Sequence, residues 1–197
     1  MVIRLLCLTL CFFFSIPVFA DENTGSISGE VEIFRARRSS DVVVYLTDVP
    51  GKFEPPAVNP KIDQKSLIFT PHVLPIVVGT TVDFANSDTV LHNIFSPSKV
   101  HKFNLGSYGT DIVKQQTFDK EGQITLLCNV HTEMSAFIVA VPNPYFAKTG
   151  NDGKFTIDNI PAGQYTLKTW HEKKQPFEQK VTVEADEITE VNIKLRR

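Results

Sequence analysis

The chain reads ITLLCNVHTEMSAFIVAV from residue 124 to residue 141. Residues 124–128 and 136–141 are short, apolar and rich in β-branched side chains, and this pattern predicts two strands joined by a short loop. Both faces of the second strand are apolar, so we expect it to be covered on both sides. The stretch therefore predicts a β-protein in which the loop between two neighbouring strands carries most of the chemically reactive side chains.

The other apolar segments predict strands as well, because they are short, rich in β-branched or aromatic residues, and bounded by Gly, Pro, Asn or Asp. No stretch has a convincing helical period, and we expect at most one short helical turn, near Lys99 to Asn104. Residues 51–64 are rich in Pro and Lys without a pattern, which predicts a linker or long surface loop. The fold class is all-β, with predicted strands at 27–34, 42–47, 65–70, 73–78, 80–85, 112–118, 124–128, 136–141, 154–157, 165–170, 177–183 and 189–195.

The loop after residue 127 offers three metal-binding side chains at three-residue steps: Cys128, His131 and Met134. His92 lies upstream and could supply a second imidazole. Two histidines, a cysteine and a weak axial methionine are the ligands of blue-copper electron-transfer sites. Burial of Cys128 as a structural thiol is the alternative, and Glu133 could replace the methionine as an axial oxygen ligand.

The N-terminus predicts export. Arg4 precedes an apolar run from Leu5 to Phe14, and Val18-Phe19-Ala20 resembles a cleavage site, so residues 1–20 are expected to be a signal peptide. An uncleaved anchor is the alternative, although the run is short for a membrane span of about 20 residues. Cleavage would remove Cys7 and Cys11 and leave one cysteine, which excludes an intrachain disulfide. We expect a periplasmic protein with no membrane span after cleavage.

Removal of Arg4 leaves 19 Lys and Arg against 22 Asp and Glu, a formal charge of −3. Such mild acidity argues against nucleic acid as a partner and does not indicate any other class of partner. His72, His101 and His171 follow no ligand spacing and are expected at the surface.

Several motifs between residues 65 and 142 resemble the cupredoxin family, in particular the amicyanin- and plastocyanin-like blue copper proteins. They are Phe69-Thr70-Pro71, the Gly-x-x-Val of Gly79 to Val82, Asn86 near Asp88, His92-Asn93, and Cys-x2-His-x2-Met from Cys128 to Met134. The resemblance implies a Greek-key β-sandwich or barrel that binds one copper ion through His92, Cys128, His131 and Met134. It also implies that the Asn93 side chain ties the two ligand-bearing segments together.

The C-terminal segment resembles the carboxypeptidase regulatory-like domain, a small transthyretin-like β-sandwich. Gly153-Lys154-Phe155 and Pro161 to Tyr165 carry its Gly-x-Phe and Pro-x-Gly-x-Tyr motifs, whereas the expected first strands appear at Gly29 to Val31 and Val42 to Leu46. We therefore predict that residues 21–50 and 146–197 form one sandwich, with a cupredoxin domain at 51–145 inserted between them. Insertion at a loop costs little closure entropy. A plain tandem of domains is the alternative.

Together these features predict an exported one-electron carrier that contacts transient protein redox partners and is not itself an enzyme. Proteins of this combined kind include methylamine-utilisation-type periplasmic copper proteins, but that resemblance does not identify the donor or acceptor. A copper-binding or trafficking protein is the main alternative, although Met134 would be the only methionine after cleavage. A copper enzyme is less compatible, because the five histidines form no His-x-His pair.

Overall fold

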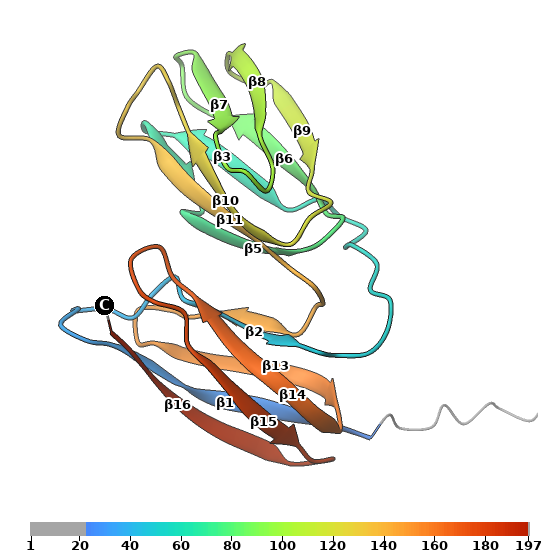
Figure 1. Ribbon diagram of the computed structural model, residues 1–197. Coiled ribbons are helices and arrows are strands. Elements are labelled where there is room, and N and C mark those ends of the chain that lie inside the picture. The colour runs from blue at the N-terminus through green and yellow to red at the C-terminus, as the bar shows by residue number, and fades with distance from the viewer. Residues whose placement is uncertain (1–22, 197) are drawn as a thin grey trace, which may run out of the picture.

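The computed structural model describes residues 23–196, and within that range it is built of sixteen β-strands in four sheets (Figure 1). The predicted all-β class is confirmed. The predicted signal peptide lies outside the described residues. No helix in the described part of the chain is long and apolar enough to cross a membrane.

The lower half in Figure 1 is a sandwich of two sheets. One has the order β13-β1-β16 (Lys154–Pro161, Thr24–Ile33, Ile188–Leu195), and the other has the order β12-β2-β14-β15 (Phe146–Lys148, Val43–Thr47, Gly163–Trp170, Glu178–Val183). Alternate residues point inward, as in β16, where Val191, Ile193 and Leu195 are buried between exposed neighbours. Gly29 of β1 pairs with Val191, and a side chain there would collide with the Val191 carbonyl oxygen, so the parallel β1–β16 contact requires glycine.

The upper half is a second sandwich. Its five-stranded sheet has the order β5-β11-β10-β7-β8 (Val73–Val77, Ser135–Val141, Gly122–Leu127, His92–Ser96, Phe103–Tyr108), and its four-stranded sheet has the order β4-β3-β6-β9 (Ile68–Thr70, Lys61–Lys65, Thr81–Asn86, Val113–Thr117). Phe84, Phe103 and Phe118 pack together between the two sheets. The core of this sandwich extends to Cys128 and Met134 at one end.

A third apolar cluster joins the two sandwiches. Val43 of the lower half packs with Val73, Val139 and Val141 of the upper half, and all four are buried. Strand β11 therefore faces the upper core on one side and the lower sandwich on the other, which explains its two apolar faces. At the edge of this contact, Trp170 Nε1 donates a hydrogen bond of 2.9 Å to Gln123 Oε1.

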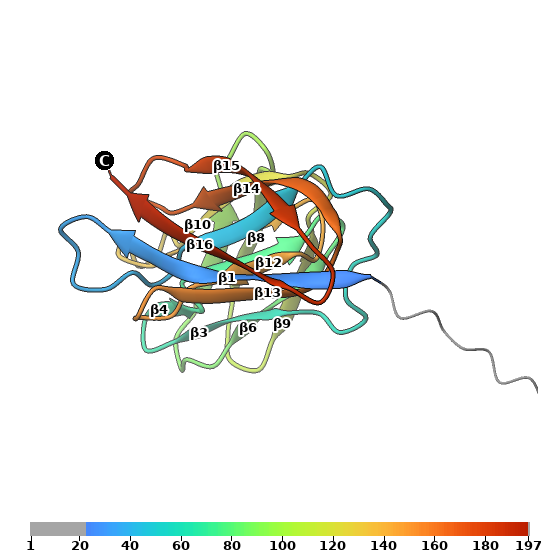
Figure 2. The same cartoon turned by 90° about the horizontal axis from the view of Figure 1, so that it is seen from below.

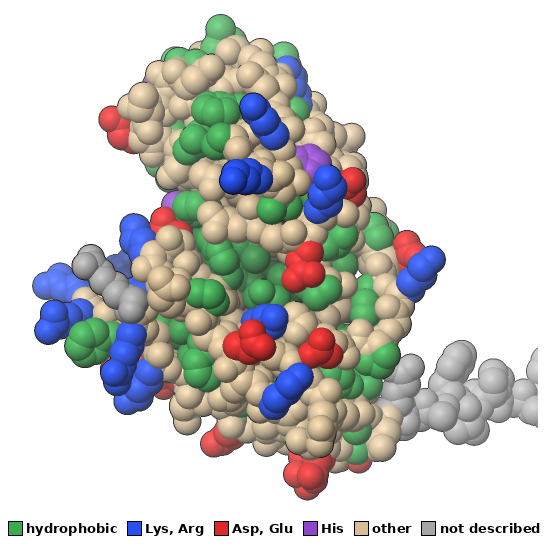
Figure 3. Space-filling model, viewed as in Figure 1, with side chains coloured by type: hydrophobic (Ala, Val, Ile, Leu, Met, Phe, Trp, Pro, Cys, Tyr) green, Lys and Arg blue, Asp and Glu red, His purple; other side chains and the backbone are tan. Residues whose placement is uncertain are grey.

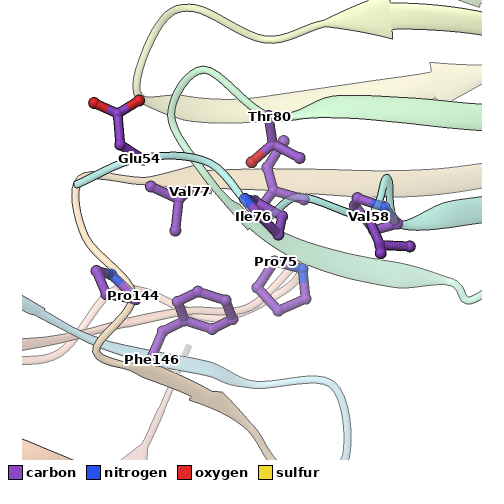
Figure 4. Close-up of a pocket in the computed structure, with 10 residues that line it drawn as sticks. Glu54, Val58, Pro75, Ile76, Val77, Thr80, Pro144 and Phe146 are labelled. Atoms are coloured by element: carbon purple, nitrogen blue, oxygen red, sulfur yellow. The ribbon is translucent and has the colours of Figure 1, made fainter.

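A hollow of about 420 Å³ lies beside the junction (Figure 4). Its walls are mainly apolar: Pro75, Ile76 and Val77 come from β5, while Pro144 and Phe146 come from the segment that returns to the lower sandwich. The hydroxyl of Thr80, on its wall, is buried and has no hydrogen-bond partner within residues 23–196.

The order of strands along the chain bears on the domain division. The chain forms β1 and β2 in the lower sandwich, then β3 to β11 in the upper one, and returns with β12 to β16. Seen from below, β1 lies between β13 and β16 (Figure 2). These pairings support our proposal that residues 21–50 and 146–197 form one domain with residues 51–145 inserted.

Some sequence predictions differ from the structure. No helix forms near Lys99 to Asn104, and Asn104 instead belongs to β8. Strand β8 lies at the edge of its sheet, and its buried and exposed residues do not alternate clearly. Residues 61–64 of the expected loop belong to β3, where Ile62 and Gln64 point inward. The strand expected at 65–70 is broken by Ser66 and Leu67, which adopt positive φ angles of 56° and 61° in a turn.

Candidate metal site

Three strands bring the predicted ligands to one end of the upper sandwich. His92 is the first residue of β7, Cys128 directly follows β10, and Met134 directly precedes β11. Strand β10 is the neighbour of both β7 and β11, with Leu127 paired to Phe95 and to Ser135. The cysteine is thereby placed beside His92, although 36 residues separate them in the chain.

The side chains of His92, Cys128 and His131 converge. Their potential ligand atoms all lie within 4.8 Å of one another. The two Nδ1 atoms of the histidines are 3.1 Å apart, and the two rings are inclined at 62°. His92 and Cys128 are buried, whereas His131 is only partly buried. The site is thus closed on the protein side and approaches solvent at His131.

Asp88 fixes the orientation of the His92 ring. Its Oδ2 lies 2.8 Å from His92 Nε2, while its carboxylate accepts hydrogen bonds from the backbone N–H groups of Ser66 and Leu67. The Leu67 N–H is the largest influence on the pKa of Asp88; together with His92 and Ser66 it lowers that pKa against the opposing effect of burial. An ionised Asp88 accepts a hydrogen bond from Nε2–H, so Nδ1 presents its lone pair to the site.

The loop from Cys128 to Met134 is closed by its own backbone. The Cys128 N–H donates to the Met134 carbonyl at 3.3 Å, and the Met134 N–H donates to the His131 carbonyl at 3.0 Å. Met134 is 1% exposed and packs in the same core cluster as Cys128, whereas Glu133 is exposed. Of the two axial candidates, the thioether is therefore the one directed into the protein.

Asn93 connects the segments around the site. Its Nδ2 donates to Asn104 Oδ1 at 2.8 Å, and its Oδ1 accepts from the backbone N–H of Asn129 at 3.4 Å. Asn104 also accepts the Gly106 N–H. These contacts join β7 to β8 and to the ligand loop.

The remaining histidines lie elsewhere. His72 contacts the Ser135 carbonyl and Glu172, and His101 contacts Gln116 and Asp119. Sequence reasoning did not assign a role to Asp88. The only hint in the sequence was that Asp88 lies four residues before the candidate ligand His92. This spacing brings the two side chains into contact only because the chain turns back between them.

The donor set suits copper. Two imidazole nitrogens and a thiol sulfur lie close together, and the thioether of Met134 belongs to the same core cluster as the thiol. Imidazole is accepted by several transition metals, while thiolate with thioether favours copper, particularly its cuprous state. The residues therefore fit a copper ion.

Comparisons with known proteins give two similarities. Residues 135–196 match the family model of the carboxypeptidase regulatory-like domain. The match begins in β11, a strand of the upper sandwich, and continues through β12 to β16, the five C-terminal strands of the lower one. No curated protein sequence matches the chain.

Among solved structures, the chain is similar to a copper-containing nitrite reductase from Thermus scotoductus SA-01, with 25% identity and a TM-score of 0.41 over 45% of this chain and 25% of that one. It spans only a quarter of that enzyme's length. A purple cupredoxin from Nitrosopumilus maritimus is 25% identical over 42% of this chain and 100% of its own, with a TM-score of 0.39. A reduced amicyanin variant is 17% identical over 50% of this chain and 98% of its own, with a TM-score of 0.41.

Proposed function

We propose that this protein is an exported mononuclear type 1 copper protein that carries one electron at a time between redox partners. The observation that supports this most directly is the convergence of His92, Cys128 and His131 within 4.8 Å, with Met134 buried in the same cluster. Copper, when bound there, would supply a one-electron couple between its cuprous and cupric states. We propose a carrier rather than an enzyme, located in the periplasm.

The surrounding residues support rapid electron exchange by holding the ligands in place. Asp88 fixes the His92 ring, and two backbone hydrogen bonds within the 128–134 loop fix the shape of that loop. Because the metal-facing side chains are positioned by hydrogen bonds and core packing, they need to move little when the charge at the site changes. Small reorganisation is the physical requirement of an electron carrier.

Exposed apolar side chains lie next to both candidate histidine ligands in the chain. Val130 is 50% exposed on the ligand loop, and Val90 and Leu91 are 44% and 60% exposed immediately before His92. We propose that redox partners dock at these side chains. A small apolar contact suits a transient complex, because electron-transfer interfaces are at the low end of interface size.

The first experiment is addition of cupric ion to the protein without its predicted signal peptide, followed by visible absorption and electron paramagnetic resonance. We expect intense absorption at about 600 nm and a narrow copper hyperfine splitting, as in blue-copper sites. A pale product with ordinary cupric parameters would exclude cysteine ligation of this type. Copper handling without electron transfer would then be the better account.

A further inference from the structure

Cationic side chains gather at one end of the lower sandwich, away from the candidate metal site. They come from three segments: the β1–β2 connection, the β14–β15 connection and the end of β16. Figure 3 shows Lys and Arg side chains crowded at this end of the lower half, around an apolar patch. The basic end, as we name it, consists of Arg35, Arg37, Arg38, Lys173, Lys174 and Arg196.

Most of these cations have no carboxylate partner. Within residues 23–196, no ion pair joins a carboxylate to Arg35, Arg37, Arg38, Lys174 or Arg196. Two nearby carboxylates are engaged: Glu172 pairs with Lys173 at 3.1 Å and Asp41 pairs with Lys148 at 3.5 Å. The whole chain has a net charge of −2, so the remainder of the molecule is clearly acidic. The positive field is therefore local.

An aromatic side chain stands among these charges. Phe34 is 52% exposed, and the Arg35 guanidinium carbon lies 5.1 Å from the centre of its ring. Phe34, Arg35, Lys174 and Arg196 line a groove of about 520 Å³. This volume is ample for a phosphodiester group, and guanidinium groups bind phosphate oxygens in a bidentate manner.

The backbone holds the basic end in shape. The Phe34 N–H donates to the Leu195 carbonyl at 3.0 Å, which fastens the β1–β2 connection to the end of β16. The Ile33 N–H donates to Ser39 Oγ at 3.1 Å and closes the turn from the other side. The cations and the phenyl ring are thus presented together rather than on a free tail.

We propose that the basic end docks onto an anionic phospholipid surface, with Arg and Lys contacting headgroup phosphates and Phe34 inserted at the interface. Both the cations and the phenyl ring of the basic end suit such a surface. Basic residues are attracted to anionic lipids, and exposed aromatic side chains partition into the interfacial zone. A protein partner with an acidic face would use the charges but would leave the exposed phenyl ring of Phe34 without a role.

The test is co-sedimentation of the protein lacking its predicted signal peptide, residues 21–197, with vesicles of phosphatidylcholine alone or mixed with phosphatidylglycerol. We expect binding only to the anionic vesicles and a decline with salt, since screening weakens surface electrostatics. R37Q/R38Q should reduce binding roughly fivefold per cation, or about 25-fold. F34A should weaken binding while leaving its salt dependence unchanged.

The matched control is K102Q/K120Q, which removes two exposed cations of the upper sandwich. Circular dichroism confirms that each variant is folded. If this control loses binding as strongly as R37Q/R38Q, binding follows net charge and the proposal is overturned. Absence of binding to phosphatidylglycerol vesicles also overturns the proposal. In that case, slower electron exchange of R37Q/R38Q with an acidic redox protein would assign the basic end to a protein partner. Free glycerol phosphate that binds as well as vesicles would overturn membrane docking in favour of a soluble phosphate ester.

Discussion

Asp88 Oδ2 lies 2.8 Å from His92 Nε2, and this contact decides which nitrogen of the histidine faces the candidate metal site. The other ring nitrogen, Nδ1, lies 3.1 Å from Nδ1 of His131. Because Asp88 is itself held by the N–H groups of Ser66 and Leu67, the orientation of the buried candidate ligand His92 depends on a turn more than twenty residues earlier in the chain. The candidate site is therefore held in shape by residues that lie outside its group of potential ligands.

Asp88→Asn tests this arrangement. The amide lacks the negative charge that stabilises a proton on Nε2, so we expect copper still to bind but with an affinity reduced about 10- to 100-fold, as for other outer-shell partners of metal ligands. Competition with a chelator of known affinity measures the change. Asp111→Asn is the matched control, because Asp111 is an exposed acidic residue in a nearby loop. Equal affinities of the two variants would show that Asp88 does not orient the ligand.

Cys128→Ser should abolish the intense visible absorption completely, because the colour of a blue-copper site arises from charge transfer between thiolate sulfur and cupric ion. Cys128 is buried, and serine is close to it in size, so the fold should persist. Absorption spectra of the copper-loaded variant and of His101→Gln, a histidine outside the site, provide the comparison. Survival of the blue colour in the serine variant would remove Cys128 from the ligand set.

Met134→Gln distinguishes the two axial candidates. An amide oxygen is a harder donor than a thioether and stabilises the cupric state, so the variant should retain copper and show a lower reduction potential. Glu133→Gln is the control, since the exposed Glu133 side chain points away from the core that contains Met134. Cyclic voltammetry measures both potentials. A shift in the Glu133 variant alone would make the glutamate the axial ligand.

Much of this organisation could be predicted from sequence, because it is local. The ligand loop lies between two strands whose apolar pattern is clear, and the inward positions of Val82 and Phe84 follow from simple alternation. Strand β8 was missed because it is an edge strand whose burial does not alternate cleanly. The role of Asp88 was missed because it depends on a turn formed by Ser66 and Leu67, and no local pattern specifies that contact.

Trp170 joins the two sandwiches, and its removal should weaken their union. Its ring centre lies 5.4 Å from that of Phe137 in β11, and its Nε1 donates to Gln123 in β10. Complete loss of a buried aromatic side chain costs about 3–5 kcal/mol, and Trp170 is only partly buried, so Trp170→Ala should lower the free energy of unfolding by about 2–3 kcal/mol. Urea unfolding followed by circular dichroism measures this free energy without relying on tryptophan fluorescence.

The comparison variant Trp170→Phe keeps an aromatic ring but loses the hydrogen bond, so it should cost only about 1 kcal/mol. Equal losses in the two variants would mean that the hydrogen bond, rather than the packing of the ring, holds the halves together at this point.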